Sequence, residues 1–136
     1  MKIWCGLAIL ALVFWALSPA GAVIGQTNKE VQAIAEPILD AVLTGLNDGN
    51  YELYAKYFDS TMKNAIPEKK FRQTSEDIAK KMGKYQSRTY LGFLKKANLT
   101  VAIWKARFSG SDDDVLVRLV LSPHGDKVEI AGLWFQ

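Results

Sequence analysis

The sequence predicts a single α+β domain in which helices come first and an antiparallel sheet of about four strands follows. Two features of the chain support this fold class. Up to about residue 82, apolar residues recur at the spacing of one helix face. After Lys84 the period falls to two, and runs of strand-forming residues are separated by turn-forming ones. Helices followed by consecutive hairpins indicate an α+β domain.

The first and longest helix is expected over residues 31–46, where apolar positions form a continuous stripe. Asn28 precedes it as the expected N-cap. Pro37 lies inside the pattern and lacks a backbone donor, so it implies either a kink or a start near Glu36. The apolar stripe is the same in both cases.

Two shorter helices and an extra turn are expected next. Asn50 is placed to cap a helix over residues 51–58, and residues 62–66 suit one further turn. Pro67 begins the third helix, because its fixed φ suits a first helical turn. Gly83 supplies the left-handed residue that ends this helix.

Four strands are expected in the second half of the chain, over residues 85–94, 99–108, 115–122 and 127–135. The short segments between them suit antiparallel hairpins. Side chains alternate along a strand, so Trp104 and Phe108 should face the helices, with Lys105 and Arg107 on the opposite face. The predicted sheet is therefore a four-stranded meander.

Both faces of this sheet are predicted to be apolar. The opposed sets are Leu99, Val101 and Ile103 against Ala102, Trp104 and Phe108, and Val128 and Ile130 against Ala131, Leu133 and Phe135. One face packs on the helices, and the other exposes an apolar patch unless something covers it. We therefore expect a homodimer formed through the sheet.

The composition excludes several classes of protein. Of the 136 residues, 49% are hydrophobic and 23% are charged, which excludes a disordered or collagen-like chain. One cysteine, Cys5, and one histidine, His124, cannot build a disulfide framework or a Cys/His zinc site. A site made of carboxylates alone stays open. The net charge of +3 is too small to indicate a nucleic acid partner.

The first 22 residues have the pattern of an export signal. Lys2 precedes an apolar run over residues 3–17, which is shorter than the ~20 residues of a membrane-spanning helix. Ala20 and Ala22 form the A-x-A pattern, which predicts cleavage before Val23. We expect residues 23–136 to form one mature domain, periplasmic or secreted, with no stable membrane anchor. The alternative is an uncleaved signal anchor.

Several short motifs accompany this order of elements, namely Asn47-Asp48-Gly49-Asn50-Tyr51, Tyr57-Phe58, Met62-Lys63, Pro67 and the final Ile130-Ala131-Gly132-Leu133-Trp134-Phe135. With these motifs, the chain resembles the nuclear transport factor 2-like superfamily, and within it small exported bacterial domains of unknown function. The resemblance covers roughly residues 28–136. It implies a cystatin-like conical roll, in which a strongly curved sheet wraps around the helices and leaves an apolar hollow.

The resemblance also implies a range of functions. Some relatives bind ligands or partner proteins in the hollow, others catalyse isomerisation or dehydration there, and many form dimers. The enzymatic relatives place an acid or a histidine beside a tyrosine. The aromatic residues expected to contact a ligand here are Tyr54, Tyr57, Phe58, Phe71, Trp104 and Phe108. The alternative for Trp104 and Phe108 is core packing, with the rings filling gaps left by alanines.

Polar candidates for catalysis are few. Glu36 and Asp40 share one helix face, but at about 100° per residue both point away from the apolar stripe around Ile38, so we expect them to face water. His124 lies at a hairpin tip, where side chains are usually exposed and functionally indifferent. The acids at 112–114 lack the alternating spacing of a calcium loop, so we expect no metal.

Two functions are therefore expected from different classes. The preferred one is an exported, non-enzymatic module that binds a small apolar ligand or a protein partner, without a cofactor. The alternative is an isomerase or hydrolase with Asp40 or Asp59 as base and Tyr54 or Tyr57 as hydrogen-bond donor, by analogy with ketosteroid isomerase.

Overall fold

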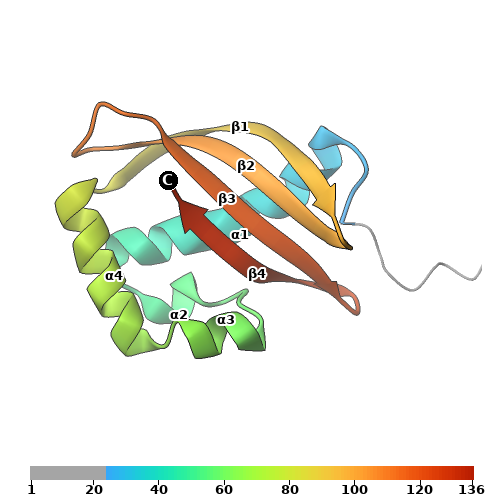
Figure 1. Cartoon of the computed structure of the whole chain (residues 1–136), viewed down its shortest axis with the longest axis horizontal. Coiled ribbons are helices and arrows are strands. Elements are labelled where there is room, and N and C mark those ends of the chain that lie inside the picture. The colour runs from blue at the N-terminus through green and yellow to red at the C-terminus, as the bar shows by residue number, and fades with distance from the viewer. Residues whose placement is uncertain (1–23) are drawn as a thin grey trace, which may run out of the picture.

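The computed structural model describes residues 24–136, and the export signal expected over residues 1–22 lies outside them. Helices come first and strands follow (Figure 1). The helices are α1 (Asn28–Asp48), α2 (Tyr51–Tyr54), α3 (Ser60–Ala65) and α4 (Glu68–Lys81). The strands are β1 (Tyr85–Lys96), β2 (Leu99–Phe108), β3 (Val115–His124) and β4 (Lys127–Phe135).

The four strands form one antiparallel sheet in the order β1-β2-β3-β4. The sheet curves over α1, while α4 lies beyond one end of the sheet and α2 and α3 lie nearer β4 (Figure 1). It does not close into a barrel. The predicted α+β class and the four-stranded antiparallel meander are confirmed.

Helix α1 is a single uninterrupted helix through Pro37, which neither begins nor ends it. Its N-cap is Thr27, one residue before the predicted Asn28, because the Thr27 hydroxyl accepts a hydrogen bond from the Glu30 amide at 3.2 Å. Gly49 ends the helix in the left-handed region at φ 63°. The buried stripe of α1 packs against the sheet and α2.

Helix α2 is shorter than the predicted 51–58. Asn50 caps it as expected, but it ends at Tyr54 because the chain then turns to pair with β4. The Ile130 amide donates to the Tyr57 carbonyl at 2.6 Å, and the Asp59 amide donates to the Ile130 carbonyl at 3.0 Å. This bridge, centred on Phe58 and Ile130, holds residues 57–59 against the edge of the sheet.

Strand β2 has the predicted orientation. Trp104 and Phe108 are buried against the core, and Lys105 and Arg107 are exposed on the other side. Small residues on the same inner face, among them Ala102 and Ala106, are fully buried between the rings. The alternation that sequence periodicity predicts is therefore confirmed for this strand.

The predicted alternation in β4 is wrong. A register shift between Val120 and Leu121 leaves Ala131 as an extra residue in β4, because Val120 pairs with Gly132 and Leu121 pairs with Ile130. The bulge reverses the face of every residue after it. Residues on both sides of the bulge therefore pack on the core, namely Val128, Ile130, Leu133 and Phe135.

Candidate functional site

The site that the fold builds is a cleft between the β3–β4 hairpin and the segment that joins α2 to α3. Its volume is about 580 Å³. Side chains from α1, from residues 56–63 and from the hairpin line it: Ile38, Lys56, Tyr57, Phe58, Lys63, His124, Lys127, Val128 and Glu129. A neighbouring hollow of about 430 Å³ shares Phe58, Lys63, His124 and Glu129, and adds Asp59, Ser60 and Ser122.

The floor of the cleft is apolar. Ile38 and Phe58 are almost fully buried there, and Tyr57 and Val128 are half-buried. The bridge between Phe58 and Ile130 fixes the distance between the two walls, since it ties residues 57–59 to β4 by backbone hydrogen bonds. The backbone segments that carry the two walls are therefore held together by the fold itself.

The rim of the cleft is polar and mainly cationic. Lys56, Lys63 and Lys127 are exposed, and the Lys56 ammonium lies 5.3 Å from the centre of the Tyr57 ring. His124 Nδ1 lies 3.7 Å from Glu129 Oε1. The His124 side chain is largely exposed, as its place in the hairpin predicted. The rim can thus offer charge to a molecule whose body rests on the floor.

The six aromatic residues expected to contact a ligand do not meet around one hollow. Tyr57 and Phe58 line the cleft. Tyr54, Phe71, Trp104 and Phe108 are buried in the core. The ring of Tyr54 lies 4.6 Å from that of Phe71 and 5.2 Å from that of Phe58. These rings pack on one another as a hydrophobic core does.

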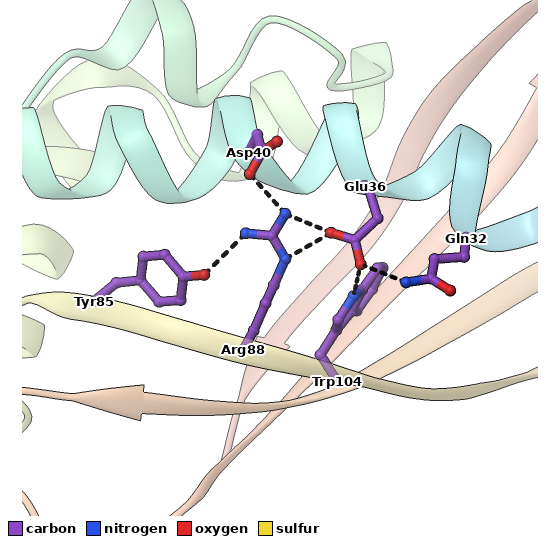
Figure 2. Close-up of polar contacts among 6 residues, drawn as sticks. All are labelled: Gln32, Glu36, Asp40, Tyr85, Arg88 and Trp104. Carbon is purple, nitrogen blue, oxygen red and sulfur yellow. Dashed lines mark hydrogen bonds and ion pairs between the residues drawn. The ribbon is translucent and has the colours of Figure 1, made fainter.

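A polar network between α1 and the inner face of the sheet is the feature that sequence analysis missed (Figure 2). Glu36 Oε1 accepts hydrogen bonds from Trp104 Nε1 at 2.9 Å and from Gln32 Nε2 at 3.3 Å. Arg88, from β1, donates to Glu36 Oε2 and, at 2.6 Å, to Asp40 Oδ1. Arg88 Nη1 also donates to the Tyr85 hydroxyl at 2.9 Å.

The expectation that Glu36 faces water is wrong, because its side chain is only 27% exposed and receives these donors. Asp40 is mostly exposed, as expected, although it pairs with Arg88. The alternation of β1 offered one signal for this network. Arg88 lies two residues before Tyr90, and both side chains point to the inner face of the sheet. A buried arginine needs carboxylate partners.

The hydrogen bonds and ion pairs of this network shift the pKa values of Glu36 and Arg88. Partial burial acts to raise the pKa of Glu36, but the hydrogen bonds from Trp104 and Arg88 outweigh it and the pKa is lowered from 4.5. The pKa of Arg88 is raised, since its two carboxylates outweigh the cost of burying the guanidinium. Both groups stay charged at neutral pH, so Glu36 is a poor proton acceptor.

The residues suggested for acid–base catalysis hold other positions. Asp40 pairs with Arg88, and Asp59 Oδ1 caps α3 by accepting from the Met62 amide at 2.7 Å. Burial raises the pKa of Tyr54 to about 12. Within residues 24–136, neither aspartate forms a hydrogen bond with Tyr54 or Tyr57.

The described residues contain neither a metal-binding cluster nor a membrane-spanning helix. Between Ile24 and Gln136, no group of three or more His, Cys, Asp or Glu side chains is placed to hold a metal ion. In the same part of the chain, no helix has the length and apolar character to cross a membrane.

Comparison with known proteins places the chain in a family. No curated protein and no solved structure matches it significantly. A family model described as "Protein of unknown function (DUF3887)" matches residues 40–133, from the middle of α1 to near the end of β4. The match includes both walls of the cleft, residues 56–63 and 124–129. Since it spans more than half of the sequence, the chain belongs to the DUF3887 family of proteins of unknown function.

Proposed function

We propose that this protein is an exported, non-enzymatic module that binds a small, largely apolar molecule in the cleft between the β3–β4 hairpin and residues 56–63. The observation that supports this is the cleft itself, with about 580 Å³ over an apolar floor. Pockets that hold small molecules commonly measure about 300–1,000 Å³ and combine an apolar lining with a few polar groups.

The alternative, an isomerase or hydrolase, has less support. It needs a carboxylate that is free to take a proton beside a tyrosine hydroxyl. Asp40 and Asp59 each have a structural partner, Arg88 and the Met62 amide respectively. A binding role asks nothing of these carboxylates and is the simpler proposal.

We also propose that the family is a distant member of the nuclear transport factor 2-like superfamily. The order of elements supports this, since a long helix, short helices and a four-stranded meander follow one another as the resemblance implies. An experimental structure that superposes α1 and the four strands on that superfamily would test it, and a different strand order would contradict it.

The binding proposal is tested with a neutral probe. Nile red is titrated into the protein as recovered from expressing cells, and its fluorescence should rise and saturate. Val128→Asp, on the cleft floor, should weaken the dye at least tenfold, because a charge there opposes burial of an apolar body. The matched control is Ile34→Asp on α1, which should leave dye affinity unchanged. Equal affinities in both variants would contradict the proposed cleft.

A second candidate function is self-association through the outer sheet face, defined as the side of the sheet away from α1. The strand register places two rows of residues on this face: Leu94, Val101, Val120 and Gly132, then Gly92, Ile103, Arg118 and Trp134. Leu94 is 57% exposed and Trp134 is 45% exposed. We propose that a second copy of the chain covers the apolar residues of these two rows.

A further inference from the structure

The chemistry of the cleft says more about its ligand than that it is apolar. We propose that the ligand is an amphiphilic anion, with a hydrocarbon body on the floor and one oxyanion head group held by Lys56, Lys63 and Lys127. This inference rests on the proposed binding function, and it adds a charge to the ligand. Three observations support it.

The first observation is the charge balance of the cleft. Three lysines and one glutamate line it, so the lining is cationic without any contribution from His124. The lysines come from three separate segments, which are the turn after α2, helix α3 and the β3–β4 hairpin. A cationic lining assembled from three segments attracts an anion more strongly than any of these side chains does alone.

The second observation is that these charges are not neutralised within the protein. Among the described residues, the ion pairs of Arg72, Arg88 and Arg107 bring carboxylates to those guanidinium groups. None of the ion pairs formed between residues 24 and 136 involves Lys56, Lys63 or Lys127. Glu129, the acid within the cleft, lies beside His124. Asp59, in the adjoining hollow, is bonded to the Met62 amide.

The third observation is the position of the charge relative to the floor. The apolar lining residues Tyr57, Val128, Ile38 and Phe58 are buried or half-buried, whereas the three lysines of the same cleft are exposed. A small inorganic anion would leave the apolar floor in contact with water, and a neutral hydrocarbon would leave the lysines without an anionic partner. A molecule with a hydrocarbon body and an anionic head covers the floor and pairs with the lysines. Flexible lysine ammonium groups suit a carboxylate or a phosphate monoester head.

The experiment compares ligands of one chain length. Decanoate, decyl phosphate and decanol are titrated by calorimetry into the protein as recovered from expressing cells. Decanoate or decyl phosphate should bind at least tenfold more tightly than decanol at low salt, and added salt should reduce that difference. The tighter of the two anions identifies the head group.

Three variants assign the effect to the charges of the cleft. The double variant Lys63→Gln with Lys127→Gln should lower the affinity for the anions at least tenfold and leave the affinity for decanol unchanged. The control, Lys69→Gln with Lys70→Gln on α4, removes the same charge from an exposed surface outside the cleft. It should change neither affinity. Glu129→Gln should act in the opposite direction and raise anion affinity, a gain that loss of folding cannot mimic.

The outcomes separate the two proposals. Equal binding of decanol and the anions would overturn the charged-ligand inference and leave the apolar cleft standing. Equal loss of anion affinity in the cleft variant and the α4 control would also overturn it, since the effect would then come from overall charge. Failure of all three ligands, and of Nile red, to bind would overturn the proposed function and this inference together.

Discussion

Trp104 shows how one side chain serves two structural purposes. Its ring is fully buried between alanines on the inner face of β2, and the Tyr90 ring meets it edge-on at 5.6 Å. Its indole N–H would be unsatisfied in an apolar core, but Glu36 accepts it at 2.9 Å. The burial of Trp104 can be predicted from strand alternation. The identity of its hydrogen-bond partner cannot, because Glu36 is 68 positions away in the sequence.

Truncation of Trp104 should be far more damaging than truncation of its neighbour. We expect Trp104→Ala to lower the free energy of unfolding by ~3–5 kcal/mol through lost burial and a cavity. Lys105→Ala, on the exposed side, should stay within about 0.5 kcal/mol. Urea melts of both variants measure this. A Lys105 variant less stable than the Trp104 variant would mean that the strand register is off by one residue.

Glu36 should make stability depend on pH. Its pKa is lower in the folded protein than the ordinary 4.5, so its contribution is fully present above pH 4.5 and is lost as pH falls through the folded value. Glu36→Gln should therefore destabilise by about 1–3 kcal/mol at pH 7. The difference in unfolding free energy between this variant and the natural protein should become smaller below pH 4.5. Urea midpoints measured from pH 7 to pH 3 check this, and a gap that widens in acid would contradict it.

At the scale of helices and strands, local chemistry predicts the boundaries well. Strands β2 and β4 begin and end where the turn residues indicate, and Asn50 caps α2 as expected. Non-local pairing accounts for the differences. Helix α2 stops early because Phe58 pairs with Ile130, and the bulge at Ala131 follows from the β3–β4 register. Neither feature leaves a signal in hydrophobic periodicity.

The cap of α3 gives a prediction at this scale. Asp59 accepts the Met62 amide at 2.7 Å, so Asp59→Ala should cost ~1 kcal/mol of stability by leaving that donor without its partner. Asp59→Asn should retain most of the natural stability, since asparagine caps helices about as well as aspartate does. Thermal unfolding compares the two. If both variants lose the same stability, the charge of Asp59 matters and not its cap.

For the whole molecule, the fold class is predictable from sequence, whereas the candidate cleft is not. The change in hydrophobic period after Lys84 predicts that helices come first and strands follow. The cleft needs Ile38, Lys63 and Val128 to meet, and they lie in three elements whose packing the pattern does not specify. Tyr57 and Phe58 were identified because aromatic residues stand out in a sequence. Exposed lysines do not, since most lysines are exposed in any protein.

The outer sheet face predicts the assembly. We expect the recovered protein to sediment as a dimer at tens of micromolar. Leu94→Lys should raise the dimer dissociation constant at least tenfold and leave the circular dichroism spectrum unchanged, because Leu94 is largely exposed within one chain. Ile34→Lys, an exposed position on α1, is the control and should remain dimeric. A natural protein that sediments as a monomer under these conditions would contradict the proposal.

The bridge between Phe58 and Ile130 also makes the two borders of the sheet unequal. Residues 57–59 occupy hydrogen-bonding groups in the middle of β4, while β1 borders the sheet on the other side. An extended strand from another molecule can therefore add along β1 but meets an obstacle at β4. Growth of a continuous sheet needs two open borders per molecule. Addition of strands from one molecule to the next would therefore stop at a pair joined through β1.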